Sequence, residues 1–147
     1  MENMGNQDTI NLLKECNAGI KMGVSSIDEV MPTVKSGELK KILELSRHEH
    51  GVLGDKTHEL LLKYGGDTAE PHLMAKGMSW LKTNVKLQLE PSDKNVAGIM
   101  TDGCNMGIKS LNSYLNQYKD ADGGVKNIAE ELIDIEERMT ERMKEYL

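Results

Sequence analysis

Two long segments of this chain repeat apolar residues at alternating steps of three and four. In the first, the repeating positions are Ile10, Leu13, Asn17, Ile20, Val24, Ile27 and Met31. In the second they are Val125, Ile128, Leu132, Ile135, Met139, Arg142 and Tyr146. This spacing keeps one side of an α-helix facing a neighbouring helix along its whole length. The sequence therefore predicts an all-α protein whose helices pack lengthwise.

Helix-stopping and helix-capping residues divide the chain into five predicted helices. Pro32 and Pro91 lie at or beyond helix ends, and Ser36 and Ser92 are suited to N-cap positions. The predicted helices are 7–32, 37–64, 69–89, 93–119 and 124–147. The first of them has one weak place, because the stretch from Gly23 to Ser26 combines low helix propensity with a capping-box pattern. A kink or break there is an open alternative.

The helix lengths favour a particular topology. The segments 7–32 and 37–64 are joined by a short turn, as are 93–119 and 124–147, so each pair is expected to form an antiparallel hairpin. The segment 69–89 is long enough to return the chain along the bundle as a helical crossover. We expect a single domain over 1–147: an antiparallel four-helix bundle with one crossover, which resembles the ferritin-like fold.

The amino-acid sequences of two stretches show a further resemblance to known proteins. "HEHGVLGDKTHELL" and "MTDGCNMGIKSLNSYL" look like small uncharacterised bacterial helical-bundle proteins near the ferritin-like superfamily. That resemblance implies the bundle fold and no particular activity.

Composition excludes several classes of protein. A net charge of −6 offers no basic excess for a nucleic-acid partner. No stretch approaches 18 apolar residues, so no membrane span is expected, and the N-terminus lacks the pattern of a secretion signal. A cytoplasmic protein is therefore expected. Its two cysteines, Cys16 and Cys104, should then be free, buried thiols.

The stretch "RHEH" at 47–50 raises the question of a metal site. Ferritin-like metal proteins place four carboxylates and two histidines inward. A helical projection turns His48 and His58 outward and leaves Glu49 on the flank of its helix. The polar residues expected to face inward are Asn17, Ser46, His50, Thr57, Cys104 and Glu136. One carboxylate and one histidine are too few for a two-metal site.

Two interpretations of this inward set stay open. In one, His50 and Glu136 hydrogen-bond each other within a core polar network, or line a pocket for a small ligand. In the other, His50 and Glu136, with Glu49 or Cys104 as a further ligand, bind a single transition-metal ion; Glu49 is the first choice. No cofactor is expected under the first interpretation.

The segment 69–89 carries a second apolar ridge around Trp80. An interface formed by Leu73, Trp80 and Leu87 would favour a homo-oligomer, with a dimer as the simplest case. We expect a non-enzymatic bundle that acts through protein interaction or oligomeric assembly, with an unidentified partner. The alternative is a metal-binding or oxidative-stress protein built on His50 and Glu136.

Overall fold

The computed structural model describes residues 6–65 and 92–147, and these form four long α-helices. Their bounds are α1 Gln7–Val30, α2 Gly37–Lys63, α4 Asp93–Gln117 and α5 Gly123–Met143. Short 3₁₀ turns, Met31–Thr33 and Lys144–Tyr146, follow α1 and α5. Four of the five predicted helices are thus confirmed with small shifts at their ends. The fifth, 69–89, lies outside the described residues, together with the interface predicted at Leu73, Trp80 and Leu87.

Side-chain caps fix where three of the helices begin. The hydroxyl oxygen of Ser36 accepts a hydrogen bond from the Leu39 backbone N–H at 3.1 Å, and that of Ser92 accepts one from Asn95 at 3.1 Å. Both predicted N-caps are therefore confirmed. Asn6 caps α1 in the same way, through a 2.8 Å bond from the Thr9 N–H. Each cap satisfies a backbone donor that has no partner inside its own helix.

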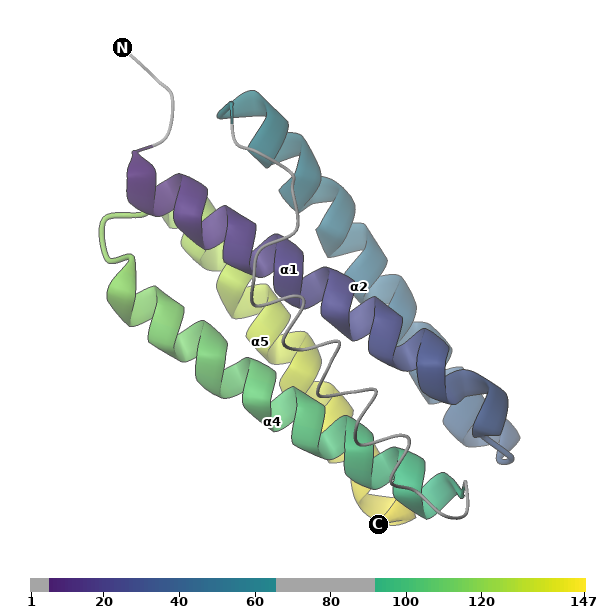
Figure 1. Ribbon diagram of the computed structural model, residues 1–147. Helices are drawn as coiled ribbons and strands as arrows, with labels where there is room; N and C mark the ends of the chain where they lie inside the picture. The colour runs from purple at the N-terminus through teal and green to yellow at the C-terminus, as the bar shows by residue number, and fades with distance from the viewer. Residues whose placement is uncertain (1–5, 66–91) are drawn as a thin grey trace.

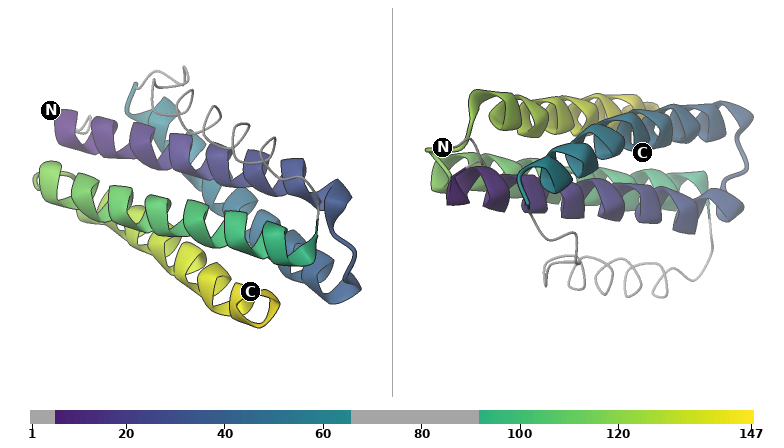
Figure 2. Two further views of the ribbon diagram at one scale, coloured as in Figure 1. Left: turned by 60° about the horizontal axis from the view of Figure 1, so that its bottom comes forward. Right: turned by 90° about the horizontal axis from the view of Figure 1, so that it is seen from above.

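The helices form two antiparallel hairpins, α1–α2 and α4–α5, laid side by side (Figure 1). Around the bundle the order is α1, α2, α5, α4, so that α1 lies beside α4 and α2 beside α5 (Figure 2). The chain leaves α2 at one end of the bundle and begins α4 at the opposite end. Residues 66–91 thus connect opposite ends, which is the connectivity of a long crossover between hairpins.

Helix α1 runs without interruption through residues 23–26, so the alternative of a break there is wrong. Ser26 does not cap a new helix; its hydroxyl donates to the Met22 carbonyl at 2.7 Å, one turn earlier in the same helix. Such back-bonding satisfies the hydroxyl without ending the helix. Gly23, the other residue of low helix propensity, lies inside the helix where its bare backbone faces the His50 ring.

The interior consists of two apolar clusters separated by a polar layer. One cluster surrounds Leu12, Leu61 and Ile128, and the other surrounds Ile27 and Leu39. Between them, His50 faces Gly23 and Glu136 faces Gly107, while Ser46 contacts His50 on the same helix; we call these five residues the waist. No helix in the described part of the chain is long and apolar enough to cross a membrane.

Candidate functional site

The residues expected to face inward are buried, and they come from all four described helices. The buried positions are Asn17, Ser46, His50, Thr57, Cys104 and Glu136. His48 and His58 are exposed, as the helical projection predicts. The structure does not join all six into one network, since the Thr57 hydroxyl donates to the Leu53 carbonyl of its own helix. Of the six, Ser46, His50 and Glu136 lie together at the waist.

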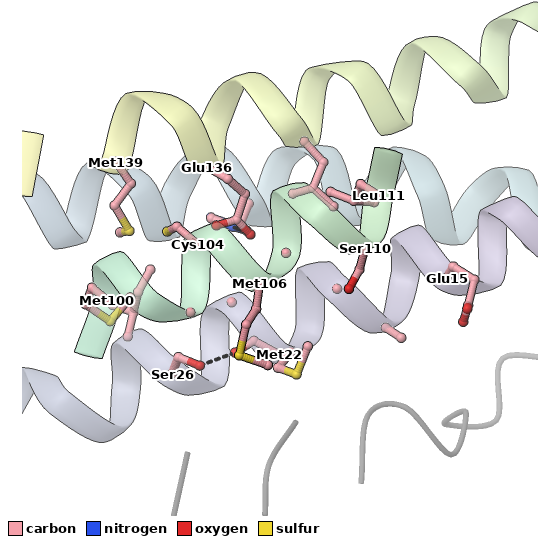
Figure 3. A pocket seen from close by; sticks show the side chains of 18 of the residues that line it. Glu15, Met22, Ser26, Met100, Cys104, Met106, Ser110, Leu111, Glu136 and Met139 are labelled. Atoms are coloured by element: carbon pink, nitrogen blue, oxygen red, sulfur yellow. Dashed lines mark hydrogen bonds and ion pairs between the residues drawn. The ribbon is translucent and has the colours of Figure 1, made fainter. Parts of the chain in front are cut away.

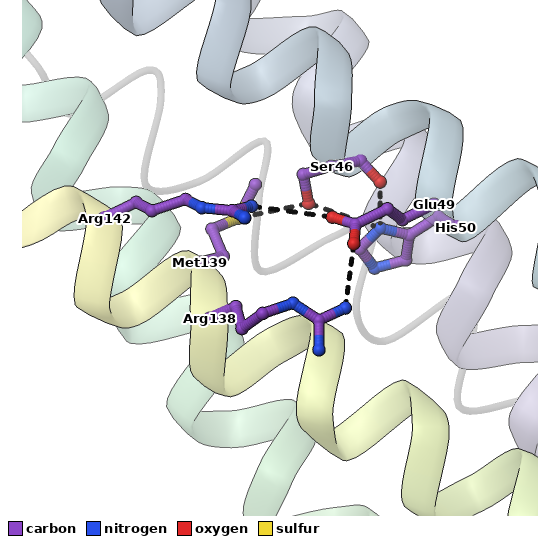
Figure 4. Close-up of polar contacts among 6 residues, drawn as sticks. All are labelled: Ser46, Glu49, His50, Arg138, Met139 and Arg142. Carbon is purple, nitrogen blue, oxygen red and sulfur yellow. Dashed lines mark hydrogen bonds and ion pairs between the residues drawn. The ribbon is translucent and has the colours of Figure 1, made fainter.

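His50 is held at the waist in one orientation. Its Nδ1 lies 2.7 Å from the Ser46 carbonyl oxygen, and because a carbonyl only accepts, Nδ1 carries a hydrogen. The Ser46 hydroxyl in turn contacts the Met139 sulfur at 3.8 Å (Figure 4). The ring is only 1% exposed, and its Nε2 has no hydrogen-bond partner. Nε2 is therefore the free end of the imidazole.

Glu136 is the nearest charged group to that free end. Its Oε1 lies 3.7 Å from His50 Nε2, which is ion-pair distance and too long for a hydrogen bond. Burial by itself lowers the pKa of His50, but the Glu136 carboxylate, the Ser46 carbonyl and the charge of Glu49 outweigh it, so the pKa is raised. Glu136 therefore favours the protonated form of the His50 ring more than water does.

Two glycines make room for these polar side chains. A Cβ atom on Gly23 of α1 would lie 2.7 Å from His50 Nε2, closer than real Cβ contacts. A Cβ atom on Gly107 of α4 would lie 3.2 Å from Glu136 Oε1. The imidazole and the carboxylate are thus packed against bare backbone of the facing helices. This close approach explains why glycine is tolerated inside two long helices despite its low propensity.

The waist opens into a cavity of about 260 Å³ between α1 and α4, which we call the α1–α4 cavity (Figure 3). Small residues on both helices leave this space, among them Gly19 and Ser110, and methionines line much of it. His50 and Glu136 lie at its inner side, and Met106, which is 44% exposed, lies at its rim. The lining is mostly apolar, with a few polar groups.

Cys104 lies beside Glu136 within the cavity (Figure 3). Burial, then the charge of Glu136 and a hydrogen bond to its carboxylate, raise the pKa of the Cys104 thiol. Burial and the nearby Glu15 likewise raise the pKa of Cys16 to about 12. Both cysteines are free and buried, as the sequence predicts, and both are neutral thiols at physiological pH.

A second carboxylate, that of Glu15, also lines the cavity. Glu15 of α1 accepts a hydrogen bond from the Tyr114 hydroxyl of α4. Partial burial raises the pKa of Glu15, and that hydrogen bond opposes the shift. Burial and the neighbouring carboxylate together raise the pKa of Tyr114, so the phenol is neutral at physiological pH. The lining of the cavity therefore includes two carboxylates, Glu15 and Glu136.

Glu49, the third residue of the hypothetical metal site, turns away from the other two. Its carboxylate forms ion pairs with Arg138 at 2.8 Å and with Arg142 at 3.5 Å, on the flank between α2 and α5 (Figure 4). Among residues 6–65 and 92–147, no group of three or more histidine, cysteine or acidic side chains is arranged to hold a metal ion. The hypothetical set of His50, Glu136 and Glu49 is not brought together.

Sequence reasoning identified the buried polar residues and missed the cavity. The missed lining residues include Gly19, Met22 and Ser110, which carry no motif. A usable signal existed in the glycines, because Gly23 and Gly107 are costly inside helices and each faces a polar residue. Thr9 was also missed; it is buried, and its hydroxyl accepts from the Asp122 N–H at 2.9 Å.

Comparison with known proteins places the fold. No protein-family model and no curated protein matches the chain. Among solved structures, the crystal structure of Dps92 from Deinococcus radiodurans matches with a TM-score of 0.75 and 13% sequence identity. The match covers 96% of this chain and 86% of that one. The chain therefore has the ferritin-like fold that its helix pattern predicts, and at this identity the likeness carries nothing beyond the fold.

Proposed function

We propose that this ferritin-like bundle binds a small, largely apolar molecule in the α1–α4 cavity and catalyses no reaction on it. The observation that carries the proposal is the unpartnered, buried Nε2 of His50, whose ring lines a cavity of mainly apolar groups. A mostly apolar cavity with a few fixed polar groups is typical of small-molecule sites.

The dimensions of the cavity limit the ligand. An apolar cavity of about 150 Å³ holds benzene. By that scale, the 260 Å³ here would accept roughly ten non-hydrogen atoms. The raised pKa of Cys104 supports a binding role over a catalytic one, because a thiolate is the nucleophilic form and this thiol stays protonated.

The test is a titration with 2-phenylethanol, followed by amide chemical shifts in ¹⁵N-labelled protein. We expect saturable shifts concentrated on α1 and α4. Ser110→Leu, which fills part of the cavity, should abolish them. Ser113→Leu, at an exposed position of the same helix outside the cavity, should leave them unchanged. Shifts that are absent, or that survive Ser110→Leu, contradict the proposal.

Self-association is a second proposed property. Leu45 and Val52 are 47% and 57% exposed and lie two turns apart on one face of α2. Exposed apolar side chains in a row favour a contact with another copy of the chain. Light scattering should show a dimer that Leu45→Glu with Val52→Glu converts to monomer.

Trp80→Ala tests the interface predicted for 69–89, and an unchanged dimer would remove Trp80 from it.

A single metal ion at His50 stays a prediction, with one observation in its favour. Metal-ligating histidines usually donate their other ring N–H to a carbonyl or carboxylate, and Ser46 provides such an acceptor. Elemental analysis of protein purified without chelators, compared with His50→Ala, decides it. Stoichiometric metal that disappears in the variant would support the site, and metal-free wild-type protein would exclude it.

A further inference from the structure

We propose that the ligand of the α1–α4 cavity carries a primary ammonium group, which binds between Glu136 and His50 while an apolar body fills the space beside the methionines. This inference rests on the proposed function, namely that the cavity binds a small molecule, and it adds the chemical class.

The charge of the cavity is the first argument. Its described lining contains two carboxylates, Glu15 and Glu136, and neither a lysine nor an arginine. Cys104 and Tyr114 are neutral at physiological pH because their pKa values are raised. The cavity is therefore net negative with His50 in either protonation state. A buried negative site favours a cation and disfavours a carboxylate ligand.

The geometry at the inner side is the second argument. Because Nδ1 of His50 donates to Ser46, a neutral imidazole offers only an acceptor at Nε2. Oε1 of Glu136 is a second acceptor, 3.7 Å away. An ammonium nitrogen has three N–H donors and can lie about 2.9 Å from each acceptor. One donor group would thus satisfy both, including the orphaned Nε2.

The remaining lining suits the apolar body of such a ligand. Met22, Met100 and Met106 line the cavity beyond the waist, together with the ring of Tyr114. Methionine side chains are polarisable and adapt to the shape of a bound group. The apolar part of the ligand therefore has a surface to bury.

Binding of an ammonium group would compete with protonation of His50. The charged groups that raise its pKa are Glu136 from α5 and Glu49 from its own helix, whereas α1 presents Gly23 to the ring and α4 presents neutral Cys104 to Glu136. A protonated imidazole already neutralises Glu136 and would repel a second cation. Affinity for an amine should therefore rise with pH as His50 loses its proton.

The test compares two probes that differ only in their head group, 2-phenylethylamine and 2-phenylethanol, by calorimetry or amide shifts at pH 8. We expect the amine to bind roughly tenfold or more tightly, since a charge-assisted pair is the stronger one. Glu136→Gln should remove most of that preference while leaving alcohol binding in place. Lowering the pH to 6 should weaken the amine and not the alcohol.

Two lysine variants test the charge preference without altering the buried Glu136 carboxylate. Met106→Lys places a cation at the rim of the cavity and should weaken amine binding severalfold. Leu62→Lys adds the same charge at an exposed position of α2 outside the cavity and should have no effect. Both positions are solvent-accessible, so neither variant should compromise folding.

The outcomes separate the two proposals. If both probes bind equally in the wild type, the ammonium class is wrong and the cavity remains a small-molecule site. If the alcohol binds more tightly, the ammonium class is also wrong. The ligand would then carry a neutral hydroxyl that donates to Glu136 and accepts from a protonated His50. If neither probe binds, the proposed function fails as well. Equal effects of Met106→Lys and Leu62→Lys would also overturn the ammonium site.

Discussion

At either end of the bundle, leucine, isoleucine and methionine side chains fill the space between the helices, whereas at the waist two polar side chains do so. In the apolar ends, residues such as Leu12 and Leu39 are completely buried against apolar neighbours. At the waist, His50 and Glu136 lie against bare glycine backbone, with the α1–α4 cavity beside them. The same four helices thus support two kinds of interior.

The comparison shows where this bundle departs from close packing. Large apolar side chains in the ends stabilise the fold without specifying a function. At the waist, His50 and Glu136 lie against glycines. His50 Nε2 is left without a hydrogen bond there, and the α1–α4 cavity is left unfilled. Such a region costs stability, and a binding site is a physical reason for retaining it.

The largest expected effect comes from removing one member of the waist pair. His50→Leu leaves the Glu136 carboxylate buried without its counter-charge and should lower the free energy of unfolding by about 3 to 5 kcal/mol. The double variant His50→Leu with Glu136→Leu replaces the pair by apolar groups, as in the ends, and should recover most of that loss. Urea unfolding measures both. A double variant no better than the single one would show that the waist cannot adopt the packing of the ends.

The second prediction concerns the glycine that faces the imidazole. Gly23→Ala places a Cβ atom 2.7 Å from His50 Nε2 and should destabilise the protein by about 1 to 3 kcal/mol, because the buried ring has little room to move. Gly51→Ala is the matched control, since nothing lies within 4 Å of its added Cβ. That change should stabilise the helix by about 0.5 to 1 kcal/mol. Thermal unfolding of both variants would contradict the close approach if their effects had the same sign.

A smaller effect is expected when pH changes the contribution of the His50–Glu136 ion pair to the free energy of unfolding. The folded-state pKa of His50 is raised above its ordinary value of 6.5, so the ion pair stabilises the fold fully below about pH 6.5. That contribution is lost as the pH rises through the folded-state pKa. The stability difference between wild type and His50→Gln should therefore shrink from pH 5.5 to 8. A difference that is constant or grows with pH would contradict the pairing of His50 with Glu136.

The smallest effect is expected at the partly exposed ion pairs between α2 and α5. Glu49 pairs with Arg138 and Arg142 on the flank, and because water reaches both arginines and screens the pairs, Glu49→Gln should cost only about 1 kcal/mol. The loss should decline further in 1 M salt. If Glu49→Gln were as costly as His50→Leu, the distinction between flank and waist would not hold.

How much the sequence predicts differs between the helices and the site. Ser36 and Ser92 mark helix starts through local hydrogen bonds, so their capping is legible from the sequence. The inward direction of His50 and Glu136 follows from helical periodicity alone. The outward direction of His48 follows for the same reason, and with it the shortage of inward carboxylates.

Periodicity places a residue on a face and does not say how closely the next helix approaches. Gly23 therefore suggested a weak point in α1, while the structure makes it the contact surface of His50. Glu49, on the edge of its helix face, was equally available to the core and to the flank. Only the placement of Arg138 and Arg142 on the neighbouring helix drew it outward.

The sequence by itself determined the helices, their caps, the two hairpins and the polar residues of the interior, because these depend on interactions within a few turns of one helix. Only the tertiary structure decided that His50 Nε2 is left without a hydrogen bond, that two glycines face the polar pair, and that a cavity separates α1 from α4. Those features depend on distances between helices far apart in the chain, and such distances follow from packing all the side chains at once.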